Sequence, residues 1–256
     1  MDKVILEKFI IKLQAKLNKK LVAENKKIKY KTKKDFQIDP VTKIDLDTEK
    51  LIRKEIVKLF PNHNIIGEEF KDKDQNSEYT WILDPIDGTK SMILGLYNWS
   101  NLIGLYHNKN CIMSFANFPI LNKYYYAIGK ESYVVSKKIK KKIKTNTRCV
   151  PSKAKVVINT LHSLRKQKIK RYIKSFKGFF KVTGVDALNF CMIAEGKIDV
   201  LIESGLKKVD ILPIILILKN SGAKITDWSG NQKFKNGDVL VAPNSKTYNY
   251  FIKKIN

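Results

Sequence analysis

The sequence of 256 residues lacks the features that mark membrane-spanning, secreted or zinc-binding proteins. Its longest apolar run, Ile211 to Leu218, has eight residues, whereas a membrane-spanning helix needs roughly 20. The three cysteines, Cys111, Cys149 and Cys191, show no CxxC or Cys/His spacing, which argues against a disulfide framework and a structural zinc site. Residues 1–8 mix charges with apolar side chains, unlike a secretory signal. We expect a globular cytoplasmic protein with reduced thiols and no membrane partner.

Arginine is scarce although the chain carries a formal net charge of +26. Of the 50 basic residues only four are arginine, the side chain best suited to reading phosphates and bases. The lysine excess is therefore explained better by a general composition bias than by a nucleic-acid site. Its densest run, residues 137–144, has six lysines and is expected to form a solvated loop or a hairpin.

Acidic residues are few and unevenly placed. Thirteen of the 24 lie between Asp35 and Asp87, and Glu131 is the only acid from Gly88 to Val185. A minority charge gathered in one segment of a lysine-rich chain indicates that something specific holds these carboxylates together. A metal ion is the obvious candidate.

Hydrophobic periodicity divides the chain near residue 145. Residues 1–145 read as an α+β half and residues 146–256 as an α/β half, and the two are expected to share an interface. The expected helices cover residues 4–22, 42–60, 165–176, 186–195 and 210–221, with a terminal helix from 245. The expected strands cover residues 64–66, 79–83, 102–107, 112–118, 124–128, 133–135, 155–158, 198–202, 224–227 and 239–242.

One short segment, Asp84 to Thr89, carries the strongest chemical signal. Asp84 closes an expected strand, Pro85 is expected to end it, and Asp87 can then turn back toward Asp84. Two carboxylates so close repel each other unless they are protonated or bridged by a cation. Oxygen ligands of this kind suit Mg²⁺.

Gly88 and Thr89 have the pattern of a short helix start, where free N–H groups bind phosphate. A magnesium site beside a phosphate cradle is suited to transferring a phosphoryl group to a metal-activated water. The segment therefore predicts a phosphomonoesterase.

Three motifs give the chain a family resemblance. Gly67-Glu68-Glu69, the run from Trp81 to Thr89 and the run from Asp39 to Asp45 resemble, in order and spacing, motifs of the inositol monophosphatase family of Mg²⁺-dependent phosphatases. The resemblance implies an α+β fold, a layered α-β-α-β-α sandwich, and a homodimer. Asp39 and Thr42 can equally serve as a helix cap.

The resemblance also assigns roles to particular residues. It implies that Glu68 and Thr89 orient the attacking water, that Asp45 supports Thr89, and that Gly88 and Thr89 offer N–H groups to the phosphate. Glu69 is expected to lie behind the ligands. The implied metal ligands are Glu68, Asp84, the carbonyl of Ile86, Asp87 and Asp210.

The substrate is indicated by flanking residues. Lys90-Ser91 and the run from Glu203 to Lys207 are similar to a histidinol-phosphate phosphatase branch of the family, although Val209 and Pro213 depart from its pattern. Asp186 either binds the ammonium and imidazole of such a substrate or caps the following helix. Glu203 either contacts substrate or merely ends a strand.

The first functional hypothesis is therefore hydrolysis of L-histidinol phosphate to L-histidinol and phosphate, a step of histidine biosynthesis. The alternative within the family is an inositol-1-monophosphatase or a broad sugar or nucleotide phosphatase. The alternative from another class is an inactive polyanion-binding protein that uses the lysine surface.

Overall fold

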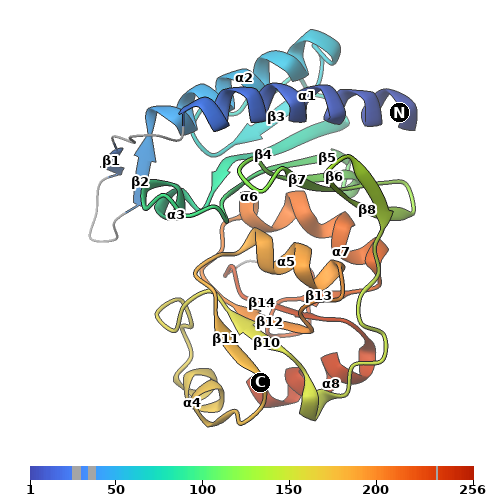
Figure 1. The fold of residues 1–256 in the computed structure, drawn as a ribbon. Helices are drawn as coiled ribbons and strands as arrows, with labels where there is room; N and C mark the ends of the chain where they lie inside the picture. Colours follow the sequence, from blue (N-terminus) through green and yellow to red (C-terminus); the bar gives the residue numbers. More distant parts are fainter. Residues whose placement is uncertain (25–29, 34–38, 235) are drawn as a thin grey trace.

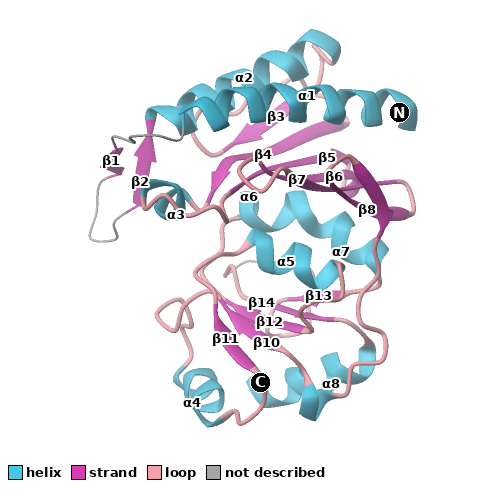
Figure 2. Ribbon diagram, viewed as in Figure 1, coloured by secondary structure: helices cyan, strands magenta, loops and turns pink. Residues whose placement is uncertain are grey.

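Five layers of secondary structure stack in the order α-β-α-β-α in the computed structural model, which describes residues 1–24, 30–33, 39–234 and 236–256 (Figures 1 and 2). One helix pair covers the outer face of the first sheet, a second lies between the two sheets, and a third covers the outer face of the second sheet. The predicted fold class is confirmed. In that order, the pairs are α1 (Lys3–Glu24) and α2 (Lys43–Leu59), α5 (Ala187–Ala194) and α7 (Ile215–Ser221), and α4 (Gln167–Ser175) and α8 (Ser245–Ile255).

The first sheet has seven strands in sequence order from β3 to β9. Only the β3–β4 pair is parallel. The lysine-rich segment forms the outermost hairpin, and all four residues of β9 are exposed. The strands are β3 (Asn64–Gly67), β4 (Tyr79–Asp87), β5 (Ser100–His107), β6 (Asn110–Phe118), β7 (Lys123–Ile128), β8 (Glu131–Ser136) and β9 (Ile139–Lys142).

The second sheet has five strands in the order β11-β10-β12-β14-β13. Strand β10 lies between β11 and β12 and is parallel to both, so the carboxyl ends of these three strands share one edge. Strand β11 is absent from the sequence expectations, as is the antiparallel pair β1 (Tyr30–Lys33) and β2 (Asp39–Thr42). The strands are β10 (Val156–Ile158), β11 (Phe180–Val182), β12 (Val200–Glu203), β13 (Lys224–Thr226) and β14 (Val239–Ala242).

The middle helical layer packs on both sheets within one hydrophobic cluster. Cys191 is fully buried in this cluster. Within the described residues, no helix is both long and apolar enough to cross a membrane. The cluster includes Phe118 and Tyr125 from the first sheet, Phe190, Ile193, Ile217 and Leu218 from the helices, and Leu201 and Val241 from the second sheet.

The segment expected as one helix from Asp210 to Ser221 is interrupted, so that prediction was wrong in its middle. A short helix, α6 (Lys208–Ile211), leads into a 3₁₀ turn, η2 (Leu212–Ile214), before α7 begins. Pro213 lies in the turn, where its missing N–H is tolerated. The turn packs on strand β5 so closely that a Cβ atom on Gly104 would lie 2.8 Å from the Cα of Pro213.

This close approach predicts that Gly104→Ala destabilises the protein. A methyl group there has no space unless the turn moves away from β5, so the free energy of unfolding should fall by about 1–3 kcal/mol. Urea unfolding measures the change. Gly95→Ala is the comparison, because its Cβ meets nothing within 4 Å and tests only the cost of a positive φ. A Gly104→Ala protein as stable as the parent would contradict the close packing.

Candidate active site

Strand β4 delivers two carboxylates to the same place by means of a bulge. The expectation that Pro85 ends the strand was wrong, because β4 continues to Asp87. Its pairing with β5 shifts register between Asp84, opposite Leu102, and Asp87, opposite Ser100. Residues three apart in a regular strand point to opposite faces. The extra residue of the bulge changes that alternation, so both carboxylates line one pocket.

Asp84 and Asp87 are nearly inaccessible to solvent. The Asp84 Oδ1 atom accepts the N–H of Ile86 at 2.9 Å. Burial raises the pKa of Asp84 well above its ordinary value, and the negative charges of Glu68, Asp87 and Asp210 raise it further. Burial also raises the pKa of Asp87 to about 6. These two groups therefore meet in an environment that disfavours two bare negative charges.

A short helix follows the bulge, as the sequence predicted. Helix α3 (Thr89–Ile93) begins after Gly88, whose φ of 85° is the left-handed conformation that glycine adopts easily. The first N–H groups of a helix have no partner within it. Gly88, Thr89, Lys90 and Ser91 all line the same pocket as the two aspartates.

Asp45 lies behind Thr89 and joins the helix cap to the site. Thr42 caps α2, and the Asp45 carboxylate accepts the Thr42 N–H at 2.8 Å in a capping box. The other oxygen of Asp45 accepts the Thr89 hydroxyl at 2.9 Å. Thr42 is thus a helix cap, one of the two expected possibilities. The side chain of Asp39 lies outside the part of the chain that the structure describes.

Glu49 holds the Gly67-Glu68-Glu69 turn, and the sequence analysis missed it. Its carboxylate is fully buried, accepts the Glu69 N–H at 2.8 Å and pairs with Arg53 at 2.7 Å. A Cβ on Gly67 would collide with it. The available signal was its position on the buried stripe of α2, which runs Asp45, Thr48, Glu49, Ile52 and Ile56 at helical spacing.

Asp210 approaches from the opposite side, on α6. Its Oδ2 atom accepts the Lys207 N–H at 2.7 Å, and burial followed by the charge of Asp87 raises its pKa to about 7. The Lys207 ammonium group lies 2.8 Å from Glu68 Oε1 and so joins α6 to the end of β3. Lys207 belongs to the site, although the sequence offered it only as part of a motif.

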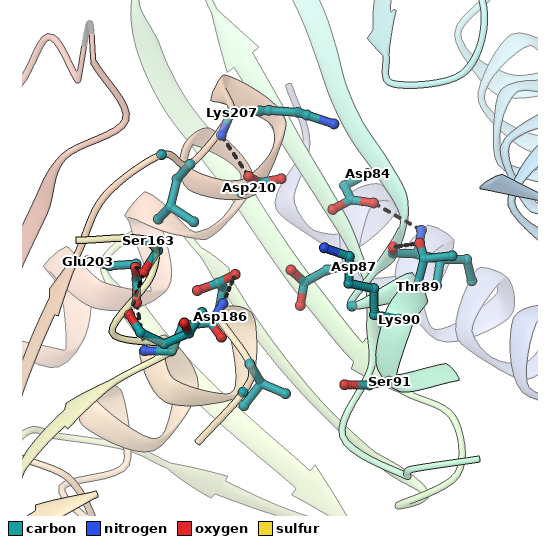
Figure 3. Close-up of a pocket in the computed structure, with 18 of the residues that line it drawn as sticks. Asp84, Asp87, Thr89, Lys90, Ser91, Ser163, Asp186, Glu203, Lys207 and Asp210 are labelled. Atoms are coloured by element: carbon teal, nitrogen blue, oxygen red, sulfur yellow. Dashed lines mark hydrogen bonds between the residues drawn. The ribbon is translucent and has the colours of Figure 1, made fainter. Parts of the chain in front are cut away.

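These groups line one cavity of about 340 Å³ (Figure 3). All residues that were expected to contact metal, water, phosphate or substrate line this cavity, with the exception of Asp45. Asp45 does not line it but accepts a hydrogen bond from the Thr89 hydroxyl. In Figure 3, Asp84, Asp87 and Thr89 form one side and Asp186, Glu203 and Ser163 the other. The lining also includes Glu68, Glu69, Ile86, Gly88, Lys90, Ser91, Asn159, Thr160, Gly184, Val185, Ser204, Gly205, Leu206, Lys207 and Asp210.

Asp186 begins α5 but does not cap it, since its side chain makes no cap hydrogen bond. Its Oδ2 atom accepts the side-chain amide of Asn159 at 2.7 Å. Its Oδ1 atom is buried and has no hydrogen-bond partner among the described residues. Burial raises the pKa of Asp186, and the charge of Glu203 raises it further. One buried acceptor of Asp186 is therefore unsatisfied among the described residues.

Glu203 ends β12 and is fully buried. One carboxylate oxygen accepts the Asn159 N–H at 2.6 Å. The other accepts the Ser204 N–H at 3.0 Å and the Ser163 hydroxyl. Both oxygens are thus engaged by the protein itself, which favours a role in shaping the wall of the pocket.

The donor set fits a hard divalent cation in its chemistry, since Glu68, Asp84, Asp87, Asp210 and the carbonyl of Ile86 offer only oxygen. Among the described residues, no group of three His, Cys, Asp or Glu side chains is already spaced to hold a metal ion. In this structure Asp84, Asp210 and Glu68 each accept a hydrogen bond from an N–H or ammonium donor.

A layered α+β fold with clustered carboxylates beside a helix start is an arrangement suited to cation-assisted phosphoryl transfer. Comparison with known proteins makes the assignment specific. The model of the inositol monophosphatase family matches residues 3–256, and the chain belongs to that family.

Individual relatives agree with this assignment. A fructose-1,6-bisphosphatase/inositol-1-monophosphatase of Aquifex aeolicus is 34% identical over 78% of this chain and 75% of its own length. A histidinol-phosphatase of Chlorobaculum parvum is 27% identical over 80% of this chain and 79% of its own. The solved structure of a Thermotoga maritima IMPase, 25% identical, superposes with a TM-score of 0.86 over 100% of this chain and 97% of that chain.

Proposed function

We propose that this protein is a Mg²⁺-dependent phosphatase whose substrate carries a cationic group on its non-phosphate part, and that this substrate is L-histidinol phosphate. The observation that carries the proposal is Asp186, a residue of the cavity lining that does not cap its helix and whose buried Oδ1 atom has no hydrogen-bond partner among the described residues. An unsatisfied buried carboxylate oxygen costs free energy until it accepts a hydrogen bond. An ammonium or imidazolium group supplies a charge-assisted donor, whereas an inositol ring offers only neutral hydroxyl groups.

The chain's own residues divide the work of hydrolysis between them. Glu68, Asp84, Asp87, Asp210 and the Ile86 carbonyl would hold the cation, which supplies Lewis acidity toward the phosphoryl oxygens and activates water. The N–H groups of Gly88 and Thr89 bind the phosphate. The Thr89 hydroxyl donates a hydrogen bond to Asp45 Oδ1. Its lone pairs would then accept a hydrogen bond from the attacking water, and Glu68 would accept a second one from the same water.

The name of one relative and two sequence features support the choice of substrate. The Chlorobaculum parvum relative is named a histidinol-phosphatase. Lys90 and Lys207, from the two motifs that resemble that branch, both line the cavity. The second candidate is an inositol-1-monophosphatase or a sugar bisphosphatase, which the name of the Aquifex aeolicus relative favours.

Asp186→Asn is expected to remove the preference for a cationic substrate. The amide keeps the size of the side chain but loses the charge, so kcat/KM for L-histidinol phosphate should fall by about 10- to 100-fold, mainly through KM. The value for myo-inositol 1-phosphate should change little. Phosphate release with Mg²⁺ from both compounds measures the difference. A parent enzyme that hydrolyses the inositol phosphate but not histidinol phosphate would refute the proposed substrate.

Two further expectations belong to the same proposal. The protein is proposed to work in the cytoplasm and to form a homodimer. Sedimentation at several protein concentrations tests the dimer.

The polyanion-binding alternative predicts salt-dependent RNA binding without any phosphate release. The cluster of carboxylates in the cavity is unsuited to a polyanion that lacks an accompanying cation.

A further inference from the structure

The wall of the cavity opposite the aspartate bulge is built on the second sheet. Strands β10 and β12 are parallel neighbours, and each ends at the cavity, β10 just before Asn159 and β12 at Glu203. The carboxyl ends of parallel strands are where open α/β sheets place their ligands. Asn159 and Glu203 therefore stand side by side at a position suited to selecting the substrate.

Asn159 is held on both sides of its backbone. Its N–H donates to Glu203 Oε2 at 2.6 Å, and its carbonyl accepts the Gly184 N–H at 3.0 Å. Its side-chain amide nitrogen donates to Asp186 Oδ2 at 2.7 Å. The amide thus engages one oxygen of Asp186, while the other, Oδ1, has no hydrogen-bond partner among the described residues.

The Glu203 carboxylate accepts three hydrogen bonds, two from the loop that follows β10 and one from the next residue in the chain. Besides the Asn159 N–H, it accepts the Ser163 hydroxyl and the Ser204 N–H. The Ser204 hydroxyl donates in turn to the Ser163 carbonyl. A carboxylate can accept all three donors, whereas an amide in its place would turn an NH₂ group toward at least one of them.

We propose that Glu203 is a positioning residue that acts through Asn159, and that Asn159 orients the carboxylate of Asp186 for the cationic group of the substrate. The inference rests on the proposed function and deepens it, because it names the residues that set selectivity for an amine. It assigns Glu203 no direct contact with substrate. Hydrogen bonds thus connect three residues in series, Glu203 at the end of β12, Asn159, and Asp186 just before α5.

The test compares L-histidinol phosphate with 3-(imidazol-4-yl)propyl phosphate, which differs only by lacking the amine. The parent should prefer the amine by at least about tenfold in kcat/KM. Asn159→Ala should reduce that preference by about five- to tenfold through the KM of the amine substrate. Its kcat/KM for the deamino compound should stay within about twofold, a split that general damage to the fold would not produce.

Glu203→Gln should give the same selective loss, and the double variant should lose no more than Asn159→Ala alone, because the two residues act in series. Asn146→Ala is the matched control, since Asn146 donates to Asp199 in the same way outside the cavity, at 2.9 Å. If Glu203→Gln does not fold, the test rests on Asn159→Ala. That variant keeps the backbone hydrogen bonds of residue 159 to Glu203 and Gly184.

The outcomes separate the two proposals. An Asn159→Ala enzyme that keeps the amine preference, or that loses both substrates equally, overturns the positioning role while leaving the proposed substrate intact. A parent that releases no phosphate from L-histidinol phosphate overturns the proposed function, and the selectivity inference with it.

Discussion

Asp87→Asn is expected to lower kcat/KM by at least about 10³-fold, a loss comparable to that from removing a principal charge-stabilising group of an active site. The thermal stability of the variant, in contrast to its activity, should not fall. Burial raises the pKa of Asp87 to about 6, which means that its charged form is disfavoured where it stands. Neutralising it should leave the melting temperature without Mg²⁺ unchanged or higher. Phosphate release and thermal melts measure both effects.

The melts also test the cation site directly. Parent protein should gain thermal stability with Mg²⁺, because a ligand that binds only the folded state stabilises it, and Asp87→Asn should gain little. Asp199→Asn is the matched control, since Asp199 is equally buried and hydrogen-bonded but lies outside the cavity. It should lose about 1–3 kcal/mol of stability and keep its activity. An active Asp87→Asn enzyme would refute the proposed ligand role.

Thr89→Val is expected to reduce kcat by about 10²-fold with little change in KM, because the variant keeps its shape but cannot orient a water molecule. The buried Asp45 carboxylate also loses the donor 2.9 Å away, which should cost about 1–3 kcal/mol of stability. Stopped assays over a substrate series separate kcat from KM, and urea unfolding reports the stability.

Thr89→Ser is the control for this prediction, since it restores the hydroxyl group and removes only a methyl group. Its kcat should remain within about tenfold of the parent value. Equal rates for the valine and serine variants would show that the hydroxyl group does not take part in hydrolysis.

The carboxylate cluster was predictable because its chemistry is local in the sequence. Asp84, Asp87 and Thr89 lie within six residues, so the chain itself keeps them close to one another. Hydrophobic periodicity indicated most of the helices and strands, and the family resemblance implied their layered arrangement. Asp210 came from the resemblance alone, since no local pattern links it to residues more than a hundred positions earlier.

Other features depend on tertiary contacts and leave little trace in the sequence. Proline is unfavourable within a strand because it has no N–H to donate, but it is tolerated at a bulge. Pro85 lies in the bulge between Asp84 and Asp87, where its carbonyl accepts the Asn101 side chain at 2.6 Å. Asn159 looks like an ordinary loop residue after a strand. Its importance appears only once Glu203 and Asp186, 44 and 27 positions away, lie beside it.

The two walls of the cavity are formed by different sheets and helices, and this has an evolutionary consequence. The groups assigned to the cation, the water and the phosphate lie mostly on the first sheet and α3, whereas Asn159, Asp186 and Glu203 belong to the second sheet and α5. With the roles proposed above, mutations at the second wall would exchange one phosphate ester for another and leave the hydrolytic groups unchanged. A lineage built on this scaffold can therefore change its metabolic role without passing through an inactive ancestor.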